Sequence, residues 1–198
     1  MHRLATIPGD DSPEDLTFVE QQIAPVIFLT TTTTDIACLS STLTLSKHHD
    51  WKGRIRALSL MTLRHPAQID HYITSSTQKA KIILVRLLGS KGHWSYGLEK
   101  LQNWMRESSD RNLIVISGTK EYETELNSIG NIDDQITSLL SDLLSIGGVN
   151  NMTKVLAILN SILEGEEINH KIIRPTQIED PLKWNWNNDK GDRVGVIL

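Results

Sequence analysis

The chain has 198 residues, 39% of them hydrophobic, and its 20 basic and 24 acidic residues give a formal net charge of -4. This composition supports a buried core, and the lack of a long basic stripe argues against nucleic acid as the main ligand. The single cysteine, Cys38, excludes an intrachain disulfide and a multi-cysteine metal site. The N-terminus lacks the apolar core of a signal peptide, and no apolar run reaches the ~20 residues of a membrane helix. We therefore expect a soluble, cytoplasmic protein without a membrane span.

Five segments are predicted to be strands, because each is a short apolar run or a short, mostly apolar segment in which apolar residues alternate with others. They lie at residues 2–7, 26–29, 55–63, 82–88 and 113–116. Most are followed by a helical period, so we expect parallel neighbours joined by right-handed crossovers. The predicted fold class is α/β, with a flavodoxin-like open parallel five-stranded sheet in the order 2-1-3-4-5 and flanking helices on both faces.

A run of threonines occupies residues 30–34, directly after the second predicted strand. Threonine suits both strand ends and helix caps, so we interpret the run as a strand end with a cap at Thr33 or Thr34, rather than as a hydroxyl-rich catalytic site. Asp35 would then lie near the positive end of the helix dipole, where a carboxylate is stabilising.

The carboxyl ends of the strands carry the candidate binding residues, because ligands of open α/β sheets collect at this edge. Gly89-Ser90-Lys91-Gly92 breaks the backbone between the fourth predicted strand and a helix. The candidate substrate-binding residues at this edge are Arg64, His65, Lys91, His93, Trp94 and Tyr96. For the two aromatic residues we favour packing of the loop over ligand contact, because aromatic rings beside glycines commonly seal such a turn.

No catalytic, cofactor-binding or metal-binding residue is predicted within the chain. The glycine loop lacks the Gly-Lys-Ser/Thr ending of a P-loop, and no Gly-x-Gly-x-x-Gly or Gly-x-Ser-x-Gly motif follows a strand. His48, His49 and Asp50 are sequence neighbours that point apart in regular structure, and no third ligand lies at a useful spacing. Tight nucleotide binding by this chain is therefore not expected.

The last third of the chain has a different pattern. Leucine and isoleucine recur at helical period over residues 136–144 and 152–163, and glycines follow both segments. We expect a flavodoxin-like α/β domain over residues 1–125, a helical hairpin packed on it over 126–165, and a linker with the first strand of a following domain over 166–198. This organisation indicates a fragment of a longer subunit.

Several separated motifs occur in the same order as in a known family. They are Met1-His2-Arg3-Leu4-Ala5-Thr6 with Pro8-Gly9-Asp10, then Arg64-His65-Pro66 with Asp70 and Tyr72, then Arg86-Leu87-Leu88-Gly89 with Trp94, Tyr96-Gly97 and Glu99, and finally Gly147-Gly148 with Asn150. Through these motifs the chain resembles the N-terminal region of the large subunit of the aerobic cobalt chelatase, the CobN type, which is related to the large subunit of magnesium chelatase.

The resemblance implies a part in an ATP-dependent ligase that inserts Co²⁺ into hydrogenobyrinic acid a,c-diamide during cobalamin biosynthesis. The implied partners are the remainder of the large subunit, two smaller AAA+-related subunits and the tetrapyrrole substrate. Cobalt and ATP would be used by the whole enzyme, with no cofactor bound by this fragment, which alone would be inactive because the catalytic residues are expected beyond Leu198. Two alternatives stay open: a non-catalytic head or docking module for assembly, and the equivalent region of a magnesium chelatase large subunit acting on protoporphyrin IX.

Overall fold

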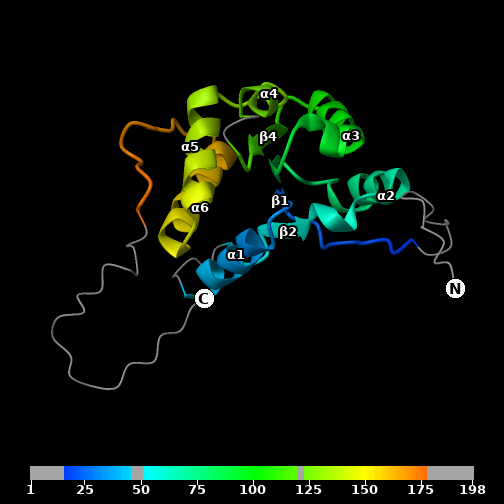
Figure 1. Cartoon of the computed structure of the whole chain (residues 1–198), viewed down its shortest axis with the longest axis horizontal. Coiled ribbons are helices and arrows are strands. Elements are labelled where there is room, and N and C mark those ends of the chain that lie inside the picture. Colours follow the sequence, from blue (N-terminus) through cyan, green and yellow to red (C-terminus); the bar gives the residue numbers. More distant parts are fainter. Residues whose placement is uncertain (1–15, 46–50, 120–122, 178–198) are drawn as a thin grey trace, which may run out of the picture.

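A computed structural model of the chain describes residues 16–45, 51–119 and 123–177. Within these residues a four-stranded parallel sheet is covered by helices on both faces (Figure 1). The predicted α/β class is thus confirmed for four strands, while the strand predicted at residues 2–7 lies outside the described residues. No helix in the described ranges has the length and apolar character needed to cross a membrane.

The strands are β1 (Val26–Thr30), β2 (Ile55–Ser59), β3 (Ile82–Leu87) and β4 (Asn112–Ser117). Every residue of β1 and β3 is buried, which explains why both are almost entirely apolar in the sequence, with Thr30 and Arg86 as the exceptions. The prediction for the third segment was too long. The chain leaves the sheet after Ser59 because the Ser59 side chain accepts a hydrogen bond from the Met61 N–H and begins a 3-10 helix, η3 (Leu60–Thr62).

The strand order is β2-β1-β3-β4, which differs from the predicted order. The prediction placed the 55–63 strand beside the 82–88 strand, but β1 lies between them and pairs with β2 on one side and β3 on the other. Burial gives the physical reason: all five residues of β1 are buried, as a central strand requires, whereas β2 is mostly half-buried, as an edge strand can be. The four described strands have the order 2-1-3-4 of a flavodoxin-like sheet when β1 is counted as the first strand. The prediction counted the same segment as the second strand, and its order was therefore wrong.

Two separate cores fill the two faces of the sheet, because alternate strand residues point to opposite sides. One face is covered by α1 (Thr33–Leu45), α5 (Asp134–Ile146) and α6 (Val149–Glu164), which share a core with Phe28 and Leu84. The other is covered by α2 (Pro66–Ser76), α3 (Ser95–Arg106) and the short α4 (Glu123–Asn127), against Leu29 and Val85. A second 3-10 helix, η4 (Lys91–Trp94), leads into α3.

The turn between α5 and α6 consists of Gly147 and Gly148, whose φ angles of 72° and 82° favour glycine. The buried side chain of Asn151, in the first turn of α6, holds this turn and the later chain together. Its amide nitrogen donates to the carbonyl oxygens of Gly147 and Thr176, and its oxygen accepts from the Thr176 N–H at 2.7 Å. The domain limits proposed from the sequence stay predictions, and the strand expected near the C-terminus lies outside the described residues.

Candidate functional site

The two aromatic residues predicted at the carboxyl edge are engaged in packing on the α2–α3 face. Trp94 is 8% exposed, and its Nε1 donates to the carbonyl oxygen of Leu63 at 2.8 Å. The Tyr96 hydroxyl donates to Asp70 Oδ2 at 2.8 Å, which joins α3 to α2. A Cβ added at Gly97 would lie 2.3 Å from the Trp94 ring, so the indole lies flat against the α3 backbone. These contacts close the loop, and a ligand role for the two rings stays a prediction.

The four polar residues predicted with them hold local structure as well. His65 Nδ1 accepts a hydrogen bond from the Ala67 N–H at 3.2 Å and caps α2, while the neighbouring Arg64 N–H donates to a side chain in the same helix. Lys91 Nζ lies 3.4 Å from a carboxylate oxygen of Glu125, and the His93 ring covers Gly89. None of the six predicted residues lines the cavity described next.

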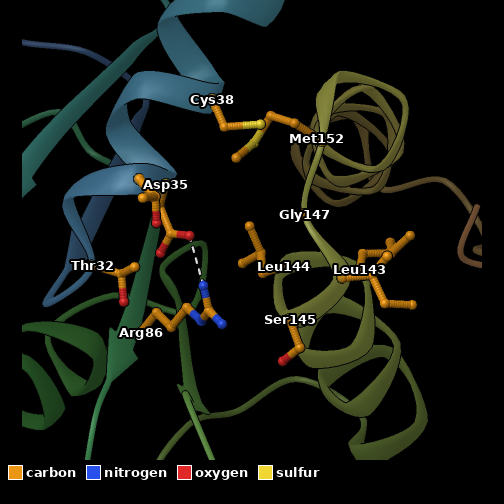
Figure 2. Close-up of a pocket in the computed structure, with 12 residues that line it drawn as sticks. Thr32, Asp35, Cys38, Arg86, Leu143, Leu144, Ser145, Gly147 and Met152 are labelled. Carbon is orange, nitrogen blue, oxygen red and sulfur yellow. Dashed lines mark hydrogen bonds and ion pairs between the residues drawn. The ribbon is translucent and has the colours of Figure 1, made fainter. Parts of the chain in front are cut away.

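A cavity of about 480 Å³ opens on the opposite face of the same sheet edge (Figure 2). It lies where β1 and β3 end side by side, which is the point at which the strand order of the sheet reverses. In open α/β sheets this crevice is the usual ligand position. The lining residues come from three parts of the chain: Thr32, Thr34, Asp35 and Cys38 after β1, Arg86 on β3, and Leu143, Leu144, Ser145, Ile146, Gly147, Gly148 and Met152 in the α5–α6 hairpin.

A buried ion pair forms the polar end of this cavity. The sheet register places Thr30 opposite Arg86, and the turn into α1 brings Asp35 over both. Arg86 Nη1 donates to Asp35 Oδ1 at 2.6 Å, and the Thr30 hydroxyl donates to Asp35 Oδ2 at 2.7 Å. The two charged side chains are only 8% and 7% exposed. Burial of charges at this depth is tolerated because each charge neutralises the other and the carboxylate accepts a further hydrogen bond.

The ion pair leaves part of its hydrogen-bonding capacity unused. Arg86 Nε and the neighbouring Thr32 Oγ1 are both buried, and neither has a hydrogen-bond partner among the described residues. Buried polar atoms are nearly always paired, so each unpaired atom requires an explanation. Both residues line the cavity, but neither of these two atoms is itself exposed to it, so a ligand in the cavity becomes their partner only after a shift of the two side chains.

The opposite wall of the cavity is apolar and sulfur-rich. The side chains of Cys38 and Met152 extend toward each other across it (Figure 2). Burial raises the pKa of the Cys38 thiol, and the negative charge of Asp35 adds to this, while hydrogen bonds from the Gly148 backbone and the Thr42 side chain act in the opposite direction. The thiol is therefore mainly protonated near neutral pH and is a weak nucleophile. Among residues 16–45, 51–119 and 123–177, no three His, Cys, Asp or Glu residues are grouped closely enough to hold a metal ion.

The sequence contained signals for the ion pair that the predictions did not use. Arg86 is the single charged residue within the apolar segment 82–88, and Asp35 is an acid placed just after a strand end. The predictions used Arg86 only within a family-like motif and gave Asp35 only a helix-dipole role. The cap prediction was also misplaced, because α1 already begins at Thr33.

Comparison with known proteins gives two significant similarities, both to the same subunit. The chain is 28% identical over 152 residues to the aerobic cobaltochelatase subunit CobN of Pseudomonas aeruginosa, an alignment that covers 76% of this chain and 12% of that protein. It is 36% identical over 81 residues to the aerobic cobaltochelatase subunit CobN of Sinorhizobium sp., covering 41% of this chain and 6% of that protein. The resemblance predicted from the motifs is thus confirmed, and the chain spans only a small part of the length of the relatives it matches.

No protein-family model matches the chain. No solved structure matches it either.

Proposed function

We propose that this chain is a domain of the large subunit of an aerobic cobaltochelatase, an ATP-dependent ligase that inserts Co²⁺ into hydrogenobyrinic acid a,c-diamide in cobalamin biosynthesis. The observation that supports this proposal is the similarity to a CobN subunit over 76% of the chain. In the proposed enzyme the remainder of the large subunit completes the tetrapyrrole site, and two smaller AAA+-related subunits hydrolyse ATP.

Within that enzyme we assign this domain to binding rather than to proton transfer. Metal insertion displaces two pyrrolic protons, and a histidine or carboxylate near the ring face would accept them. His65 and His93 are the two histidines among the residues predicted at the sheet edge. The Nδ1 atom of His65 caps α2, and the ring of His93 lies against Gly89. The cavity beside Arg86 is the better place for this domain to contact a ligand, because buried polar atoms there lack partners.

The activity is tested with the complete polypeptide that contains this chain, purified and mixed with the two smaller subunits, ATP, Co²⁺ and hydrogenobyrinic acid a,c-diamide. We expect the absorption spectrum of the cobalt corrin to appear only when ATP and all three subunits are present. Omission of the large polypeptide is the control. Insertion of Mg²⁺ into protoporphyrin IX, with no reaction of cobalt and the corrin, would instead identify a magnesium chelatase subunit.

The docking alternative is tested in the same reaction. A large subunit in which residues 16–177 are deleted is compared with the intact polypeptide for insertion rate and for assembly with the smaller subunits by size-exclusion chromatography. A binding role predicts that the shortened subunit still assembles and requires a higher corrin concentration for half-maximal rate. Loss of assembly would favour the docking role.

A further inference from the structure

The cavity beside Arg86 presents a charged side chain whose hydrogen bonds are only partly used. The Arg86 side chain is 8% exposed, and its Nη1 is committed to Asp35 at 2.6 Å. The guanidinium has a second edge, formed by the N–H groups of Nε and Nη2, which point in the same direction. Nε is buried without a partner among the described residues, and Figure 2 shows the guanidinium directed toward Leu144 and Ser145 across the cavity. This free edge is suited to a planar acceptor with two oxygens.

A second unpaired group lies at the same end of the cavity. Thr32 Oγ1 is buried and has no partner in the described part of the chain, although the Thr32 N–H is bonded to Thr30 Oγ1 at 3.0 Å. The Thr32 hydroxyl can donate one hydrogen bond to an acceptor that lies against Arg86. One ligand could therefore satisfy both unpaired groups.

The Arg86–Asp35 pair has no net charge, so the positive partial charge that favours an anionic ligand comes from a neighbouring helix end. The charge of Asp35 is already matched by Arg86 and by the Thr30 hydroxyl. The N-terminus of α6, a 16-residue helix, borders the cavity at Gly148, has no side-chain cap and carries no acidic residue in its first turn. Its unsatisfied N–H groups add partial positive charge on that side. The remaining wall at Leu144 and Met152 is apolar and suits an aliphatic chain.

We propose that this cavity binds a carboxylate carried on a short aliphatic arm. After a small shift of the two side chains that exposes Arg86 Nε and Thr32 Oγ1, the carboxylate accepts two parallel hydrogen bonds from Arg86 Nε and Nη2 and one from the Thr32 hydroxyl, and the arm contacts Leu144 and Met152. At about 480 Å³ the cavity lies in the range of small-molecule clefts, and it suits a single arm better than a whole macrocycle. Resting on the proposed function, the arm is a carboxylate side chain of the corrin substrate; a free aliphatic carboxylate is the other source of the same chemistry.

The reaction rate of Cys38, the single cysteine of the chain, can report whether the cavity is occupied. Cys38 lines the cavity, so an occupant should slow its reaction with the uncharged reagent N-ethylmaleimide. The purified 198-residue chain is treated at mildly alkaline pH with increasing hexanoate, or with hexanamide, which has the same chain but no charge. We expect saturable protection by hexanoate at a concentration roughly tenfold or more below that needed for hexanamide. Absence of saturable protection by hexanoate, or equal protection by the amide, would overturn the proposal.

Substitutions test whether the protection of Cys38 by hexanoate depends on Arg86 and Thr32. Arg86→Lys keeps the positive charge beside Asp35 but removes the two-nitrogen edge, and we expect it to weaken hexanoate protection about tenfold or more. Thr32→Val removes only the hydroxyl and should weaken protection by a smaller factor, up to about tenfold. Thr44→Val, at the exposed end of α1, is the matched control and should leave protection unchanged. Circular dichroism verifies that each variant is folded, and unchanged protection in folded Thr32→Val and Arg86→Lys would contradict the assignment.

Two corrins distinguish a carboxylate side chain of the corrin from a free aliphatic carboxylate as the ligand of the cavity. Hydrogenobyrinic acid a,c-diamide should protect Cys38, whereas the corresponding corrin with every arm amidated should not. Protection by hexanoate without protection by the acid corrin would support the carboxylate site and overturn its link to the proposed substrate. The metal-insertion assay described above does not depend on this measurement, so failure of the cavity proposal and failure of the proposed function give different results.

Discussion

The carboxyl edge of the sheet carries two polar regions that differ in how completely their hydrogen bonds are used. On the α2–α3 face, Trp94 and Tyr96 each donate to a defined acceptor within the domain, at 2.8 Å in both cases. On the α1–α6 face, Arg86 and Thr32 retain buried polar atoms without partners in the described residues, beside a cavity. The difference teaches that conspicuous aromatic residues in a loop can serve packing, while an inconspicuous charge within a strand can keep part of its hydrogen-bonding capacity unused.

The largest effect is expected from breaking the ion pair in the α1–α6 region. Asp35→Ala leaves the Arg86 charge buried without its carboxylate, so we expect the free energy of unfolding in urea to fall by about 3–5 kcal/mol. Glu125→Ala removes the partner of the exposed Lys91, and this control should cost about 1 kcal/mol or less. Similar losses in the free energy of unfolding in the two variants would show that the buried ion pair stabilises the fold no more than the exposed one does.

A smaller loss is expected from disturbing the packing of the α2–α3 region. The added methyl of Gly97→Ala would lie 2.3 Å from the Trp94 ring, so we expect a loss of about 1–3 kcal/mol in the same measurement. Gly92→Ala is the matched control, since its methyl would meet nothing closer than 3.5 Å. Combining Gly97→Ala with Trp94→Phe should cost less than the sum of the two single changes, because both act on one contact. Strict additivity would argue against that contact.

The smallest effect concerns the pH dependence of stability at the α2–α3 surface. Desolvation acts to raise the pKa of Asp70, but hydrogen bonds from Tyr96 and Lys100, with the charge of Lys100, outweigh it and hold the pKa below its usual value. The ionised carboxylate therefore stabilises the folded state above the unfolded pKa, and this stabilisation is lost as pH falls through the lower folded pKa.

We therefore expect the stability difference between the native chain and Asp70→Asn to be present at neutral pH and to shrink below about pH 4. Urea unfolding at a series of pH values measures it. Tyr96→Phe removes one of the two hydrogen-bond donors and should reduce the pH-dependent part. A difference that stays constant across the series would rule out Asp70 as its source.

The central strands were predictable because a strand that is buried on both faces consists of almost only apolar residues, a pattern that can be recognised in the sequence. The segments 26–29 and 82–88 contain almost only apolar residues, and every residue of β1 and β3 is buried, although β3 ends at Leu87 and Leu88 is exposed. The strand order was not predictable, because the choice of β1 as neighbour to both β2 and β3 depends on packing across the whole sheet. The cavity was missed for the same reason. Its polar end exists only because the β1–β3 register brings Thr30 beside Arg86, which are 56 positions apart in the numbering.

The Asn151 side chain links the cavity to the path of the later chain. One amide group bonds both the Gly147 carbonyl, in the turn that borders the cavity, and the backbone of Thr176. A displacement of the backbone at Thr176 therefore acts on this turn through three hydrogen bonds, two between Asn151 and Thr176 and one between Asn151 and Gly147. The position of the segment around Thr176 and the shape of the cavity wall are therefore coupled, and an occupant that holds the wall in place would also restrict the motion of that segment.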